Sequence, residues 1–229
     1  MNDKLPVYGA ASRSLNLVVR LPLKTLTLPL VTMFLLLISA CAGVGIVSTE
    51  DPLAKLNDAE VLIQQKNRPV PAEKLIQEAI AIYQSTDDLH GLGNAYREYG
   101  DLLRSFAVVR WEPQYRRYGF LDKSITFDNR LVKATDFYGK ALESYERAVP
   151  KLREAGRYDA LTNVYFNMAW SHRALEATAQ ACADFDHTVE AYTENMKRNP
   201  SAKSHVPAGF SSLPDAIAHA KQEAGCPSS

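Results

Sequence analysis

The strongest indication of the fold of this 229-residue chain is the segment Leu92-Gly-Asn-Ala-Tyr-Arg-Glu-Tyr-Gly-Asp101. Starting from Leu92, its apolar residues fall at i, i+3, i+4 and i+7, which is the spacing of one helix face. Gly93 follows Leu92, and the aromatic Tyr96 comes three residues later. A residue without a side chain lets a neighbouring backbone approach closely, and an aromatic ring fills the space beside it. The segment therefore predicts a helix that packs tightly against another helix.

A complementary pattern, in which an alanine is followed by an aromatic residue four positions later and by another alanine after three more, occurs downstream. This spacing is found at Ala141, Tyr145 and Ala148, and again at Ala134, Tyr138 and Ala141. A third match consists of Ala181 and Phe185, with Thr188 in place of the last alanine. It follows Met168-Ala169, in which a large apolar residue precedes a small one, as Leu92 precedes Gly93. Together the two patterns resemble the first and second helices of degenerate tetratricopeptide (TPR) repeats. A non-repeat helical bundle whose alanine and aromatic spacing reflects only core packing remains the alternative.

The resemblance implies an all-α fold, a TPR-like α-solenoid of paired antiparallel helices over residues 53–200 with an insertion at about 104–130. Residues 201–229 are expected to form a loop and a C-terminal capping helix, because an open-ended stack needs a terminal element with a polar face. Breaker residues predict three boundaries. Gly100 closes the helix that contains Leu92, Pro113 stops the next one, and Pro150 ends a long helix that begins near Asn129.

The N-terminus has the order of a secretory signal, with four basic residues followed by the uncharged run 26–40. Ile38-Ser39-Ala40-Cys41 resembles the lipobox of bacterial lipoproteins, which implies cleavage before Cys41 and acylation of that residue. Residues 1–40 are then the signal peptide, and 41–52 a lipidated tether. The absence of Asp at position 42 implies an outer-membrane lipoprotein that faces the periplasm. The alternatives are an ordinary cleaved signal with a chance cysteine, or an uncleaved anchor.

Charge and motif content exclude several function classes. The chain has 26 basic and 26 acidic residues, and residues 41–229 carry a formal net charge of −3, which argues against a nucleic-acid partner. It has no dinucleotide-binding, P-loop, nucleophile-elbow or zincin motif, and its five histidines lack metal-ligand spacing. We therefore expect no catalytic residue, no cofactor and no metal ion, and the chain is predicted not to be an enzyme.

TPR arrays usually bind extended peptides along their first helices, and the resemblance assigns candidate positions for such a groove. They are His90, Asn94 and Arg97 in one helix and Asn163, Phe166, Trp170 and Arg173 in another. Asparagine and arginine side chains there can hydrogen-bond a peptide backbone or a carboxylate. For each residue alone, a solvated helix face is the competing interpretation.

The insertion concentrates arginine and aromatic residues, since Arg104–Phe120 holds four arginines, one tryptophan, two tyrosines and two phenylalanines. Protein interfaces are enriched in these types. The interface candidates are Arg110, Trp111, Tyr115, Arg116 and Arg117. The equally weighted interpretation is that the aromatic rings cover a hydrophobic edge left by an interrupted repeat.

Cys182 and Cys226 remain once Cys41 is lipidated, and cysteines in an oxidising compartment often pair. A bridge between them would pin the terminal helix onto the last repeat and contribute roughly 3–4 kcal/mol on the chain-entropy estimate. The alternative is a buried Cys182 and a free Cys226.

These inferences combine into a membrane-anchored envelope lipoprotein whose helical repeats bind another envelope protein or a peptide segment of one. One competing hypothesis is an enzyme or small-ligand binder with a pocket near the 104–130 insertion. A second is a mainly structural homo-oligomer.

Overall fold

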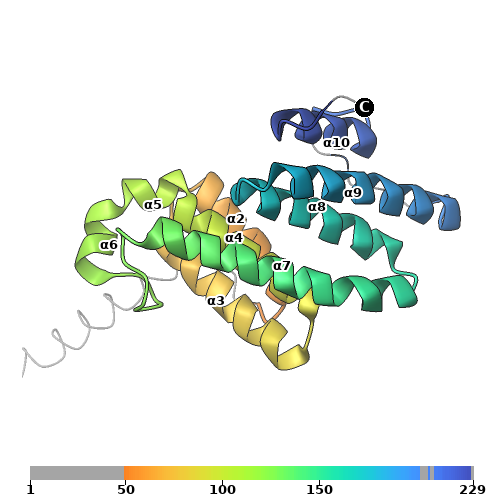
Figure 1. The fold of residues 1–229 in the computed structure, drawn as a ribbon. Coiled ribbons are helices and arrows are strands. Elements are labelled where there is room, and N and C mark those ends of the chain that lie inside the picture. Colours follow the sequence, from red (N-terminus) through yellow and green to blue (C-terminus); the bar gives the residue numbers. More distant parts are fainter. Residues whose placement is uncertain (1–48, 202–205, 207–208, 228–229) are drawn as a thin grey trace, which may run out of the picture. The chain divides into compact units, whose positions relative to one another are not determined.

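Short turns join a succession of α-helices in the computed structural model, which describes residues 49–201, 206 and 209–227. Within these ranges every regular element is a helix and no strand occurs, so the expected all-α class is confirmed for them. The helices are α2 (Pro52–Gln64), α3 (Pro69–Thr86), α4 (Leu89–Arg104), α5 (Phe106–Arg110), α6 (Glu112–Tyr118), α7 (Arg130–Glu154), α8 (Tyr158–Ala174), α9 (Thr178–Arg198) and α10 (Leu213–Glu223) (Figure 1).

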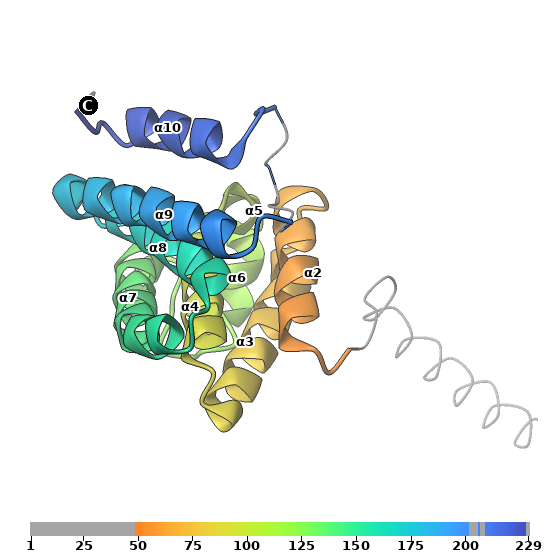
Figure 2. The same ribbon diagram turned by 90° about the vertical axis from the view of Figure 1, so that its right-hand side faces the viewer.

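The long helices of the described residues pack as three successive pairs. α2 packs against α3 and α8 against α9, each pair joined by a short turn, whereas α4 packs against α7 although residues 105–129 lie between them in sequence. Neighbouring pairs are joined by contacts of α3 with α4 and of α7 with α8 (Figures 1 and 2). In sequence, the α5–α6 segment and the loop after it lie between α4 and α7, the two helices of the middle pair.

The short turns between long helices share one backbone device. Each contains a residue with positive φ, namely Asn67, Asp87, Gly156 and Glu176. After three of them, the next N–H donates to the carbonyl five residues back, in Asp88–Tyr83, Arg157–Leu152 and Ala177–His172. This left-handed cap satisfies carbonyls at the end of one helix and reverses the chain into the next.

Glycines in α4 admit tyrosine rings from the helices around it. A Cβ on Gly93 would lie 2.5 Å from the Tyr145 ring, and one on Gly100 would lie 2.9 Å from the Tyr138 ring. Both rings are buried. The rings of α7 therefore occupy space that any larger residue in α4 would take, which brings the two backbones close.

Three predicted helix boundaries are wrong. Gly100 does not close its helix, because α4 continues to Arg104 and the glycine serves close packing instead of a left-handed turn. Pro113 lies in the first turn of α6, where its missing N–H costs nothing, so it begins a helix instead of stopping one. Pro150 lies inside α7, which runs on to Glu154 while Val149 and Leu152 pack against the core formed by α7, α8 and α9.

The C-terminal helix α10 lies against α9 and is tied to it covalently. Cys182 and Cys226 form a disulfide with a Cα–Cα distance of 5.6 Å, which is the pairing favoured from the sequence. Ile217 of α10 is buried against Ala169 and Phe185. α10 thus covers apolar surface that the last pair of helices would otherwise expose.

The segment between α4 and α7 is held by a small buried cluster. The rings of Tyr115 and Phe120 stack with centroids 4.1 Å apart. The buried carboxylate of Glu73, from α3, accepts a hydrogen bond from the Leu121 N–H at 2.7 Å and another from the Tyr99 hydroxyl at 2.8 Å. A side chain of the first helix pair therefore fixes the backbone of the inserted segment.

Residues 1–48 lie outside the described ranges, and with them the predicted signal peptide, the lipidated Cys41 and most of the tether. Among the helices that are described, none combines the length and the apolar character needed to cross a membrane.

Candidate functional site

A surface hollow of about 480 Å³ lies where α4, α7 and α8 meet. Its lining consists of Arg97, Asp101, Arg104, Ser105, Tyr138, Trp170, Arg173 and Ala174. We call this hollow the arginine groove, because three of its eight residues are arginines and only one is acidic. It includes residues that the sequence placed on two separate helices.

Helix periodicity explains why these side chains converge. On α4, Arg97, Asp101 and Arg104 stand at i, i+4 and i+7, which places them in one row on one face. On α8, Trp170, Arg173 and Ala174 form the equivalent row at i, i+3 and i+4. The two rows face the same space because both helices pack against α7.

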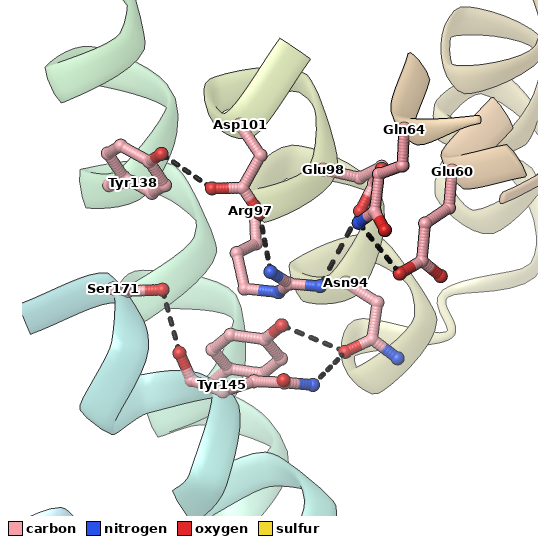
Figure 3. Close-up of polar contacts among 10 residues, drawn as sticks. Glu60, Gln64, Asn94, Arg97, Glu98, Asp101, Tyr138, Tyr145 and Ser171 are labelled. Atoms are coloured by element: carbon pink, nitrogen blue, oxygen red, sulfur yellow. Dashed lines mark hydrogen bonds and ion pairs between the residues drawn. The ribbon is translucent and has the colours of Figure 1, made fainter. Parts of the chain in front are cut away.

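The floor of the groove is a chain of charged and polar contacts. The Arg97 guanidinium lies 2.5 Å from an Asp101 carboxylate oxygen through Nη1 and 3.5 Å from Glu98 through Nη2. The Tyr138 hydroxyl donates to the other Asp101 oxygen at 2.6 Å. Figure 3 shows Arg97 between Asp101 and Glu98, with Tyr138 reaching the same carboxylate from α7. Asp101 is thereby held by two groups from two helices.

At the floor of the groove, burial and neighbouring charges shift the pKa values of Arg97 and Glu98 in opposite directions. Burial raises the pKa of Glu98 to about 7, even though Arg97 favours its ionised form. Burial also opposes the charge on Arg97, but Asp101 and other neighbours outweigh it, so the Arg97 pKa lies above its usual value. The pKa of Tyr138 is raised by burial and by Asp101. Arg97 therefore stays charged and Tyr138 stays a hydrogen-bond donor.

A second polar cluster, deeper between the helices, uses Asn94. Its side-chain oxygen accepts hydrogen bonds from the Tyr145 hydroxyl at 2.8 Å and from the Asn167 amide at 2.9 Å (Figure 3). The Ser171 hydroxyl donates to the backbone carbonyl of Asn167. This cluster joins α4, α7 and α8, so the Asn94 oxygen holds the helices together and is not free for a peptide.

The rim of the groove is open and cationic. The Arg173 guanidinium lies 4.7 Å from the centre of the Trp170 ring and reaches the Glu223 carbonyl at 3.5 Å. The exposed Arg104 donates to the Ala174 carbonyl at 2.9 Å. Neither guanidinium has an acidic partner among the described residues. The rim therefore presents two cations beside the half-buried Trp170 ring to a ligand.

The structure brings together only part of the predicted peptide groove. Arg97, Trp170 and Arg173 line the arginine groove. His90 does not: its Nε2 is buried without a partner, and burial lowers its pKa. Asn163 is exposed elsewhere on α8. Phe166 packs at 6.0 Å from the Phe185 ring in the core beneath α10.

The predicted interface residues of the insertion also separate into groups. The prediction that Tyr115 belongs to an interface is wrong, because its ring is buried against that of Phe120. Arg116 is engaged with Glu112 at 2.6 Å and Asp128 at 2.9 Å. Trp111 is half-buried, while Arg110 and Arg117 are exposed.

A smaller hollow of about 340 Å³ lies against the insertion. It is lined by Tyr115, Arg116, Gly119, Lys123, Ile125, Thr126, Phe127 and Asp128. Its cations are already used: Arg116 forms the two ion pairs above, and Lys123 donates to the backbone carbonyls of Phe120 and Tyr118. This hollow therefore offers no free charged group to a small ligand.

Sequence reasoning missed Asp101, Arg104 and Tyr138 as members of the site. Asp101 and Arg104 continue the row of side chains that starts at Arg97 on one face of α4. Helix periodicity would have identified them as groove residues if the helix had been expected to continue past Gly100. Tyr138 was interpreted only as a packing residue, since its hydroxyl partner lies on another helix.

Among the residues that the structure describes, no group of three or more histidine, cysteine or carboxylate side chains is placed to hold a metal ion. No protein-family model, curated protein or solved structure shows significant similarity to this chain. The geometry above is therefore the basis for assigning a function.

Proposed function

We propose that this chain is a periplasm-facing, outer-membrane lipoprotein whose TPR-like helical repeats act as an adaptor, and that the arginine groove binds an extended, acidic peptide segment of an envelope protein. The single observation that carries the proposal is the open cationic rim beside Trp170. An acidic side chain or a chain terminus can accept charge-assisted hydrogen bonds there while apolar peptide groups pack on the indole ring.

The arrangement of the helices supports a TPR-like solenoid. The helices form three successive pairs, and a turn with a positive-φ residue joins every two consecutive long helices except α4 and α7. The first helices of the second and third pairs, α4 and α8, both supply the groove. In repeat stacks of this kind, corresponding helices line one continuous surface. α10, held by the disulfide, fits the role of the polar-faced terminal element.

The proposed location rests on the sequence of the N-terminus. A lipobox-like Ile38-Ser39-Ala40-Cys41 after an uncharged run supports lipidation of Cys41. The disulfide between Cys182 and Cys226 agrees with an oxidising compartment such as the periplasm.

An enzymatic role has less support in the groove. Apart from Tyr138, its only hydroxyl belongs to Ser105, which accepts a hydrogen bond from the Val108 N–H as the N-cap of α5. No histidine lines the groove beside it. A nucleophile needs an adjacent base, and this lining pairs none.

The binding proposal is tested with a displayed library of random peptides. We expect enrichment of peptides that combine Asp or Glu with apolar or aromatic residues. Arg173→Glu should weaken their binding about tenfold or more, because a charge-assisted contact becomes a repulsive one. Arg147→Glu is the matched control, since Arg147 is an exposed arginine of α7 outside the groove. Equal affinity in both variants would remove the groove from the mechanism.

The location is tested separately by intact-mass spectrometry of the protein extracted from membranes. A chain that begins at Cys41 and carries acyl groups is expected. An unmodified Cys41 contradicts the lipoprotein assignment without bearing on the groove.

A further inference from the structure

Exposed apolar side chains are concentrated in one short part of the molecule. Among the described residues, eight large apolar side chains are exposed, and six of them fall within residues 106–132. These six are Phe106, Val109, Tyr118, Leu121, Leu131 and Val132. We call them, together with Arg110 and Arg117, the insertion surface. Scattered single apolar residues need no explanation, but a cluster of this kind marks an interaction site.

Local geometry explains why these side chains point outward. On α5, Phe106, Val109 and Arg110 share one face at i, i+3 and i+4, while Ala107 and Val108 are buried on the other. At the start of α7, Leu131 and Val132 are exposed and Ala134 is buried. Figure 1 shows that α5, α6 and the first turn of α7 lie at the same end of the helical unit. The buried cluster of Tyr115, Phe120 and Glu73 fixes the backbone beneath them.

The insertion also differs in charge from the rest of the chain. Residues 104–130 contain six basic and three acidic residues, whereas the remainder of residues 41–229 contains 16 basic and 22 acidic ones. The insertion thus carries a formal charge of +3, and the remainder −6. A chain with this separation of charge turns its cationic end toward an anionic surface.

Two arginines of the insertion surface are free to bind anions. Arg110 lies 5.5 Å from the centre of the Phe106 ring, and Arg117 lies 5.1 Å from that of Tyr118. Neither guanidinium has a hydrogen bond or an ion pair among the described residues, in contrast to Arg116. Each pair places a cation beside an exposed ring, an arrangement suited to the boundary between lipid headgroups and acyl chains.

We propose that the insertion surface docks on an anionic phospholipid surface. The apolar side chains enter the headgroup boundary, and Arg110 and Arg117 bind lipid phosphates. This proposal rests on the proposed lipid anchor at Cys41, which holds the domain beside the membrane so that a weak surface affinity is sufficient to orient it. Charge complementarity and protruding apolar side chains favour a deformable lipid surface over a preformed protein pocket.

The two tryptophans of the chain make the proposal testable. Trp111 joins α5 to α6 within the insertion, and Trp170 lies in the arginine groove. The lipidated mature protein is reconstituted in vesicles whose phosphatidylglycerol carries bromine on its acyl chains, which quenches nearby indole fluorescence. In single-tryptophan variants, Trp170→Phe and Trp111→Phe, we expect about twofold quenching of Trp111 and little of Trp170, and loss of the Trp111 effect in brominated phosphatidylcholine or at high salt.

Matched substitutions separate docking from general exposure. Val109 and Val70 are both 39% exposed, but only Val109 belongs to the insertion surface. Val109→Ser, and Arg110→Glu combined with Arg117→Glu, should reduce the quenching of Trp111 to the level of Trp170, whereas Val70→Ser should leave it unchanged. Circular dichroism confirms that each variant remains helical.

The outcomes decide between docking and its alternatives. Unquenched Trp111 in anionic vesicles, or equal quenching in neutral ones, overturns the proposal. So does a stable dimer in light scattering that Val109→Ser dissociates, because a second copy would then cover the surface. If mass spectrometry finds no acyl group on Cys41, the anchor fails separately. Vesicle co-sedimentation of the unlipidated mature chain then tests the surface alone, and failure to sediment with anionic vesicles overturns it.

Discussion

The α4–α7 pair and the exposed side of the inserted segment use aromatic residues in different ways. In the pair, the Tyr138 and Tyr145 rings are buried against Gly100 and Gly93 of α4. In the insertion, Tyr118 and Phe106 are exposed and lie beside arginines. In the α4–α7 pair, a glycine opposite makes room for each of the two tyrosine rings. The exposed rings of the insertion have no such partner and are available for binding.

The insertion has a buried side and an exposed side. Its buried side includes the Tyr115–Phe120 stack and the hydrogen bond from the Leu121 N–H to Glu73, with Ala107, Val108, Ile125 and Phe127 buried as well. α4 and α7 pack along their length without it. Substitutions on the exposed side of the insertion should therefore change binding and leave the helix pairs intact.

The largest difference between the two regions is expected from removing one ring in each. Tyr145→Ala removes a fully buried ring and its hydrogen bond to Asn94, and should lower the free energy of unfolding by about 3–5 kcal/mol. Phe106→Ala removes a ring that is 70% exposed and should change it by no more than about 0.5 kcal/mol. Urea denaturation followed by circular dichroism measures both. Similar losses in the two variants would mean that the insertion is part of the folding core.

The sequence predicted the all-helical class well because helix signals are local and periodic. The Leu92–Asp101 segment and the alanine–tyrosine spacing around Tyr145 lie in helices that do pack together. The predicted helix boundaries were wrong where a residue type can either end a helix or be accommodated within one. Gly100 and Pro150 are common helix terminators, but here tertiary packing continues both helices past them. That outcome depends on Tyr138, Val149 and Leu152, which lie beyond the reach of a local pattern.

A smaller, sharper test concerns glycines inside helices. Gly93→Ala should destabilise the protein by about 1–3 kcal/mol, because the new methyl group would stand 2.5 Å from the Tyr145 ring. Gly139→Ala in α7 meets nothing within 4 Å and should stabilise it by about 0.5–1 kcal/mol through helix propensity. Thermal unfolding of the pair gives the sign directly. A destabilising Gly139→Ala or a neutral Gly93→Ala contradicts the ring-against-glycine account of the α4–α7 contact.

The site was harder to predict than the fold, for a physical reason. Arg97, Trp170 and Arg173 were among the groove positions that the TPR resemblance assigns, and these three do line one hollow. Whether such a residue is free depends on its partners in three dimensions. Asn94 is occupied by Tyr145 and Asn167, and Tyr115 is buried under Phe120. Composition showed that the insertion is rich in arginine and aromatic residues, but only burial distinguished Tyr115 from Tyr118.

The last test concerns Glu73, the point where the two regions meet. Burial raises its pKa from 4.5 to about 6, although Leu121 and Tyr99 donate hydrogen bonds to it. Below pH 4.5 the carboxyl is protonated in both the folded and the unfolded chain. As the pH rises from 4.5 to about 6, the unfolded chain loses this proton before the folded chain does. The free energy of unfolding should therefore fall by up to about 2 kcal/mol and stay lower above that range.

Glu73→Gln removes this fall and keeps an acceptor for both hydrogen bonds, since Leu121 and Tyr99 donate to the same oxygen, Oε1. Denaturant unfolding between pH 4 and 8 compares it with the wild type and with Glu98→Gln. The latter keeps the step at Glu73 and loses a separate one, because burial raises the pKa of Glu98 to about 7. If wild type and Glu73→Gln lose stability in parallel between pH 4.5 and 6, the buried carboxylate is not ionising there. Ionisation of Glu73 would then have no part in coupling the insertion to the first helix pair.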